Sequence, residues 1–162
     1  MTEMFDKNKK AKKYLTSLVQ LSKIGGKLDK KEKDFLYVIG KKQGLEAKEI
    51  DKIIEKVKTT QLQIPYINLF YFPVLIEGSN LNHLHIPENK DEKINLLIDC
   101  LVLLNVDEQV SEEELDYVTN FALRLGFKSE IAGIMVRKMA MELKYGKSRE
   151  QIKDKIIPFL VY

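Results

Sequence analysis

The chain has 162 residues, of which 44% are hydrophobic and 31% are charged, and its formal net charge is +3. This composition is typical of a globular protein with its own core, and it excludes a low-complexity or collagen-like chain. The single cysteine, Cys100, excludes an internal disulfide, and no apolar run reaches the roughly 18–20 residues of a membrane span. The first residues lack the apolar stretch of a secretory signal, so we expect a cytoplasmic protein.

The N-terminal third of the chain is rich in lysine and predicts three helices. Residues 1–60 hold 16 lysines and 9 acids, whereas the rest holds 11 basic residues and 15 acids. Leu15, Leu18 and Val19 follow a helical spacing, and a glycine pair ends this first helix. The sequence DKKE then has the spacing of a capping box, and Gly44 is suited to end the second helix. A third helix is predicted over about 46–58.

The segment 60–93 is the least regular part of the chain. Its longest apolar run, 64–76, favours a core segment between two halves of the protein; the alternative is an exposed aromatic patch for a partner or a second copy of the chain. His83 and His85 stand in a predicted loop, and without a further histidine or a cysteine nearby they favour an ordinary loop over a metal site.

The C-terminal half predicts a second set of helices. Asn89, followed by a glutamate three residues later, is suited to begin the first of them. The sequence SEEE begins the next helix as a capping box, Gly126 ends it, and another helix follows over 129–144. A further helix is predicted over about 148–160, with a similar start at Ser148 and Gln151, and the apolar residues of its last part are expected to dock on the bundle.

The two halves of the chain are related by a shift of 82 residues without a gap, which places 14–57 over 96–139. Apolar positions keep the same phase in both copies. The identical pairs are Leu15 with Leu97, Leu21 with Leu103, Glu32 with Glu114, Asp34 with Asp116, Gly44 with Gly126, and Lys56 with Lys138.

This repetition predicts an all-α protein: a helical bundle of about seven to eight helices built from two pseudo-twofold-related three-helix repeats. We expect a single domain over 1–162. The first repeat spans about 14–58, the connecting segment about 60–93, and the second repeat about 94–144.

The joint between the first two helices of each copy resembles the signature of the TerB (tellurite-resistance protein B) family. The stretches are KIGGKLDKKEKDFLYVIGKKQGL and LNVDEQVSEEELDYVTNFALRLGF. The resemblance implies an all-helical pseudo-twofold bundle of bacterial stress-response and tellurite-resistance systems, which also occurs as a membrane-tethered module on a DnaJ-type co-chaperone. It further implies an acidic surface and divalent-metal binding. Asp107 takes the place of the motif aspartate in the second copy, whereas Gly25 stands there in the first.

The acidic residues near the second joint suggest a cation site. The stretch from Asp107 fails as a calcium EF-hand, because the ligand and glycine positions of that loop are not matched. Asp107 and Glu114, joined by Asp99 two helical turns earlier and by Glu32 in the first copy, are the candidate ligands for calcium or magnesium. Acids in a first helical turn also favour the helix dipole without any metal, and this alternative stays open.

No nucleophile elbow, phosphate loop or dinucleotide fingerprint occurs in the sequence. The leading hypothesis is therefore a non-enzymatic interaction or stress-response module with a protein partner. A homodimer and peripheral association with a membrane complex are both compatible with it. One alternative is a metal-dependent enzyme or accessory subunit that uses carboxylates. The other is a binder of nucleic acid or anionic membrane; its candidate residues are Lys7, Lys9, Lys10, Lys12 and Lys13. Nucleic acid is the less favoured ligand, since its usual basic motifs are missing.

Overall fold

The computed structural model describes residues 2–23, 27–57, 86–106 and 109–161, and these ranges are almost entirely helical. Their α-helices are α1 (Thr2–Ser22), α2 (Lys30–Lys42), α3 (Ala47–Lys56), α4 (Lys90–Leu104), α5 (Glu112–Leu125), α6 (Ser129–Lys144) and α7 (Arg149–Ile156). A short 3₁₀ helix, η3 (Ile157–Phe159), follows α7. The described ranges contain no β-strand, only an isolated bridge between Phe127 and Leu160. The all-α prediction is confirmed.

The predicted helix starts are present as capping boxes. Asp29 begins α2, Ser111 begins α5 and Ser148 begins α7, and each side chain accepts from the backbone N–H three residues later. In each case the side chain of the third helical residue also accepts a hydrogen bond from the backbone N–H of the cap residue. These reciprocal bonds satisfy backbone donors that a helix start otherwise leaves unpaired.

Two glycines end their helices in the same way. Gly44, with φ of +88°, follows α2, and Gly126, with φ of +98°, follows α5. The residue after each glycine donates back into the helix: Leu45 N to Gly40 O at 2.9 Å, and Phe127 N to Ala122 O at 3.1 Å. This is the Schellman pattern, in which the left-handed residue strongly favours glycine.

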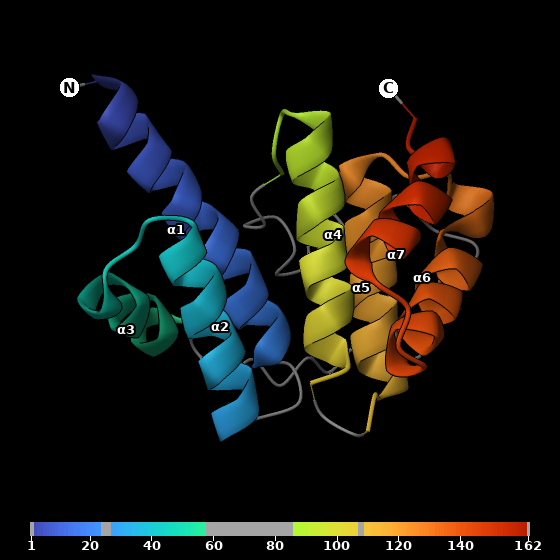
Figure 1. The fold of residues 1–162 in the computed structure, drawn as a ribbon, viewed down its shortest axis with the longest axis horizontal. Coiled ribbons are helices and arrows are strands. Elements are labelled where there is room, and N and C mark those ends of the chain that lie inside the picture. The colour runs from blue at the N-terminus through green and yellow to red at the C-terminus, as the bar shows by residue number, and fades with distance from the viewer. Residues whose placement is uncertain (1, 24–26, 58–85, 107–108, 162) are drawn as a thin grey trace.

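The helices form two groups of three with α7 added. α1, α2 and α3 contact one another, as do α4, α5 and α6, while α1 and α4 join the groups and α7 packs on α4 and α6. Figure 1 shows α1 to α3 on one side and α5 to α7 on the other, with α4 next to α1 between them. One buried apolar cluster runs through both groups, from Leu15 and Leu18 to Leu97 and Leu101.

The first helix is longer than its predicted apolar pattern. α1 begins at Thr2, although the predicted repeat begins at about residue 14. Residues 2–13 contain no glycine or proline and are rich in lysine, so the helix propagates through them. Within this stretch only Ala11 is buried. The early turns of α1 therefore contribute little to the core.

Two sequence features lie outside the described residues: the apolar run 64–76, and the pair His83 and His85. Among the helices that are described, none combines the length and the apolar character required to cross a bilayer.

Candidate functional site

Two of the four predicted metal ligands are used at helix starts. Glu32 accepts a hydrogen bond from the backbone N–H of Asp29 at 3.0 Å, and Glu114 accepts one from Ser111 at 2.8 Å. Glu32 is buried and Glu114 is half-buried. Both carboxylates therefore have a local role that requires no cation.

Asp99 lies at the centre of a buried contact between three helices. The hydroxyl of Tyr14 on α1 donates to Asp99 Oδ2, and Arg149 Nη1 on α7 donates to Asp99 Oδ1 at 2.6 Å. The Asp99 side chain is 5% exposed, whereas that of Arg149 is 41% exposed. A buried carboxylate is costly without partners, and the phenol and guanidinium supply them here.

This contact joins the two groups of helices and fixes α7. Burial, and then the charge of Asp99, raise the pKa of the Tyr14 phenol far above its usual range. Tyr14 consequently stays protonated and donates at any physiological pH. Beside it, burial raises the pKa of the Cys100 thiol well above its ordinary value, which argues against a nucleophilic role for this cysteine.

The described residues do not by themselves make a metal centre. No group of three histidine, cysteine, aspartate or glutamate side chains suited to a cation occurs among them. Asp107, the predicted ligand in the α4–α5 joint, lies outside the described residues. Since Asp99 already neutralises Arg149, calcium or magnesium at this joint depends on Asp107 and Glu114 and stays a prediction.

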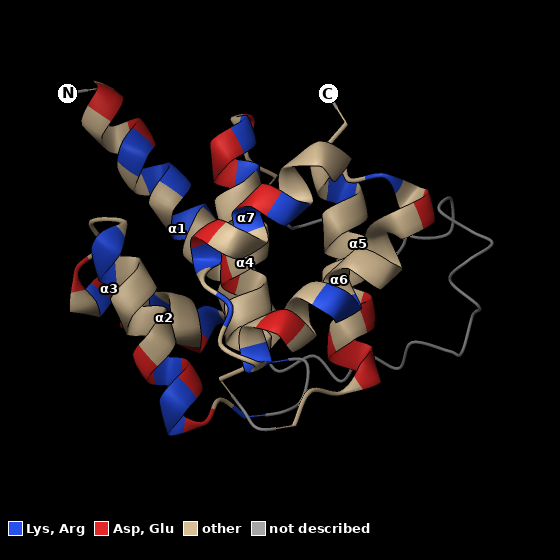
Figure 2. Ribbon diagram, turned by 45° about the vertical axis from the view of Figure 1, so that its right-hand side comes forward, with Lys and Arg blue, Asp and Glu red and all other residues tan. Residues whose placement is uncertain are grey.

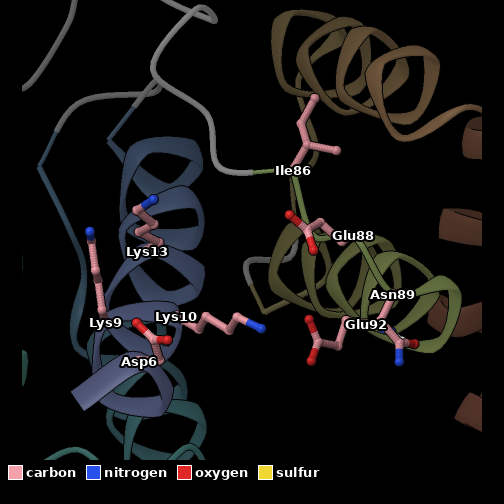
Figure 3. A pocket seen from close by; sticks show the side chains of 8 residues that line it. All are labelled: Asp6, Lys9, Lys10, Lys13, Ile86, Glu88, Asn89 and Glu92. Carbon is pink, nitrogen blue, oxygen red and sulfur yellow. Dashed lines mark hydrogen bonds between the residues drawn. The ribbon is translucent and has the colours of Figure 1, made fainter. Parts of the chain in front are cut away.

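A depression of about 480 Å³ lies between α1 and the start of α4. Asp6, Lys9, Lys10 and Lys13 line it from α1, and Ile86, Glu88, Asn89 and Glu92 line it from the other side. Figure 3 shows Lys10 extending from α1 toward Glu92. All eight residues are exposed and their charges balance, so water screens them and the depression lacks the dry, apolar walls typical of a small-molecule site.

Two surfaces present large apolar side chains to solvent. The first is the outward face of α6, where Ile134 is 68% and Met141 58% exposed, continued by Tyr145 at 79%. The second is the first turn of α1, where Met4 and Phe5 are exposed. Figure 2 shows lysines along the turns of α1 that follow.

Sequence reasoning missed the partners of Asp99. A signal existed, because Asp99 interrupts the apolar stretch LLIDCLVLL, where a charge demands a partner. The partners are 85 and 50 residues away along the chain, so no local pattern identifies them.

No family model matches the chain, and searches of curated proteins and of solved structures gave no match either. Function is therefore inferred from the residues and their geometry.

Proposed function

We propose that this chain is a non-enzymatic interaction module of the TerB-like kind, which presents a helical surface to a protein partner. Its framework is two related triplets of helices, α1 to α3 and α4 to α6. Its recognition surface is the outward face of α6, formed by Ile134, Met141 and Tyr145. The exposure of these three residues is the observation that carries the proposal.

The helix bounds support the internal duplication. α1 ends at Ser22 and α4 at Leu104; α2 begins at Lys30 and α5 at Glu112; α3 begins at Ala47 and α6 at Ser129. Each of these pairs differs by the 82 residues of the sequence repeat. The capping boxes and the glycine ends differ by the same number. The stretches that resemble the TerB signature fall on the α1–α2 and α4–α5 joints.

The three residues of the recognition surface are spaced so that they lie on the same side of the helix. Residues 134, 141 and 145 are separated by seven and four positions, so they lie along one side of a helix. The buried residues of α6 lie on its opposite side, among them Ala132, Val136 and Met139. In the first triplet, the position that corresponds to Ile134 holds Lys52. Exposed apolar side chains that gather on one side of a helix, here with Lys138 between them, are typical of an interaction site.

A capture experiment with matched variants tests this function. Met141→Glu places a charge in the proposed surface, and Val38→Glu is the control, because Val38 of α2 is 56% exposed but stands apart from α6. We expect a partner from an extract of the producing cells to bind the wild type and the Val38→Glu variant and to be lost with Met141→Glu. Sedimentation of the purified chain shows whether the partner is a second copy of the same chain or a different protein. Equal capture by both variants contradicts the proposal.

Cation binding is tested separately, because the resemblance implies it and the three described candidate ligands, Glu32, Glu114 and Asp99, already accept hydrogen bonds within the chain. Calcium and magnesium are titrated into the wild type, an Asp107→Ala variant and a Glu114→Gln variant, and amide NMR shifts of the α4–α5 joint are followed. Shifts in the wild type that vanish with Asp107→Ala support a site. Unchanged shifts and an unchanged melting temperature contradict cation binding. They do not bear on the proposed interaction surface on α6.

A further inference from the structure

The N-terminal end of α1 extends beyond the part of the helix that the repeat explains. By the shift of 82 residues, the first residue of α4, Lys90, corresponds to Asn8, so residues 2–7 of α1 have no counterpart in α4. Met4 is 79% and Phe5 83% exposed in this extension. Figure 1 shows this end of α1 projecting past α2 and α3.

Lysines follow the two apolar residues along the helix. Residues 2–13 hold five lysines against two acids, Glu3 and Asp6. One of the lysines, Lys12, is held by Glu49 of α3 at 3.0 Å. The four others are exposed: Lys7, Lys9, Lys10 and Lys13. Lys9, Lys10 and Lys13 line the depression together with Asp6, Glu88 and Glu92, whereas Lys7 lies outside it.

The spacing along the helix axis matches the outer layers of a bilayer. A helix rises about 1.5 Å per residue, which places Lys7 about 3 Å and Lys9 about 6 Å behind Phe5. The headgroup layer on each side of a bilayer is roughly 5–7 Å thick. When Met4 and Phe5 enter the boundary with the acyl chains and the axis of α1 follows the bilayer normal, Lys7 and Lys9 therefore lie at the level of the phosphates. Glu3, about 3 Å beyond Phe5, has to extend its side chain back toward the headgroups.

We propose that the N-terminal end of α1 docks on an anionic phospholipid surface. Met4 and Phe5 insert at the interface, while Lys7 and Lys9 contact the headgroups. The basic charge of residues 7–13, which hold five lysines and no acid, is complementary to such a surface. The N–H groups of the first helical turn add a further positive field.

Vesicle binding gives a direct test. The chain contains no tryptophan, so Phe5→Trp introduces a single reporter at the proposed insertion point. With vesicles of phosphatidylcholine containing 30% phosphatidylserine, its emission is expected to shift to the blue, and with phosphatidylcholine alone it is not. Tyr145→Trp, equally exposed beside α6, is expected to show no shift.

Matched variants separate this site from general charge attraction. Each lysine near an anionic surface contributes roughly fivefold to affinity, so Lys7→Glu with Lys9→Glu is expected to weaken vesicle binding at least about 25-fold. Phe5→Ala is expected to weaken it about tenfold. The control is Lys138→Glu with Lys144→Glu, which changes the net charge equally on α6, across the bundle from this end of α1 (Figures 1 and 2).

The control pair is expected to bind within about threefold of the wild type. The proposal is overturned by any of three results: no binding of the wild type to the anionic vesicles at 50 mM salt, equal losses in the α1 and α6 charge variants, or binding to duplex DNA or polyglutamate without binding to vesicles. All of the substituted side chains are exposed, and a melting temperature equal to that of the wild type verifies the fold of each variant.

Discussion

Gly40 of α2 lies against Ile50 of α3 with no room for a side-chain carbon between them. A Cβ built on Gly40 would be 2.7 Å from Ile50 Cδ1, 2.8 Å from Ile50 Cγ1 and 3.3 Å from Leu15 Cδ2. Ile50 and Leu15 are fully buried, so neither can turn toward solvent. We expect Gly40→Ala to lower the free energy of unfolding, even though alanine is the better helix former.

The sign follows from two opposed terms. Replacing a glycine inside a helix by alanine stabilises the helix by about 1 kcal/mol. Forcing an extra carbon into a close-packed core costs about 1–3 kcal/mol. The net expectation is a loss of about 1 kcal/mol, which corresponds to a melting temperature about 2–4 °C lower for a chain of this size.

A double-mutant cycle isolates the contact. Ile50→Ala removes both atoms nearest the new Cβ and by itself costs about 2–5 kcal/mol through the cavity it leaves. In that background Gly40→Ala has space and is expected to stabilise the protein by about 1 kcal/mol, a coupling of about 2 kcal/mol. A shift of 82 residues in the sequence places Ala122 and Ala132, both buried, at these two positions.

Urea unfolding followed by circular dichroism measures all four members of the cycle, with equal m-values as the condition for comparing them. If Gly40→Ala stabilises the wild-type chain, or if the two substitutions are additive within about 0.5 kcal/mol, the packing inferred at the α2–α3 contact is wrong.

Three further predictions concern ionisable groups. Tyr14→Phe leaves one buried oxygen of Asp99 without its donor and is expected to cost about 1.5–3 kcal/mol in urea unfolding; a cost below 0.5 kcal/mol would show that water replaces the phenol. The pKa of Tyr14 is raised in the fold, so its contribution is fully present below the unfolded value of 10.0 and is lost as the pH rises above it. Stability measured between pH 9 and 11.5 should therefore fall more steeply in the wild type than in Tyr14→Phe. Bonds from the Glu46 backbone, Lys12 and Asn8 lower the pKa of Glu49 from 4.5 to about 2, so its contribution is present above pH 4.5 and is lost as the pH falls toward 2. Glu49→Gln should flatten this acid dependence of the urea midpoint, and identical curves would contradict the assignment.

The ends of the helices could be predicted from the sequence because the contacts that make them are local. The capping boxes at Asp29, Ser111 and Ser148 join residues three apart, and the Schellman ends at Gly44 and Gly126 join residues within six positions. Such short-range bonds depend on residue type and spacing alone. The predicted third helix of the second half, 129–144, agrees with the bounds of α6, although no side-chain cap bond marks its start.

The candidate cation site could not be judged in the same way. The sequence positions of Glu32 and Glu114 are compatible with a capping role at a helix start and with a role as metal ligands, because a carboxylate has two oxygens. The structure assigns the capping bonds to them and surrounds Asp99 with Tyr14 and Arg149. A cluster of acidic residues in the sequence is thus a weak predictor of a metal site, because the packing of the helices determines which groups contact each carboxylate.

The sequence by itself determined an all-helical chain and the positions where most of its helices begin and end, and it predicted a repetition between the two halves. Only the tertiary structure decided which charges are neutralised and which apolar residues stay exposed. Asp99 is buried because α1 and α7 bring a phenol and a guanidinium to it from distant parts of the chain, whereas Phe5 and Ile134 stay in solvent because no described helix packs over them. Helical periodicity places a residue on a face of its helix, and only packing between helices determines what lies opposite that face.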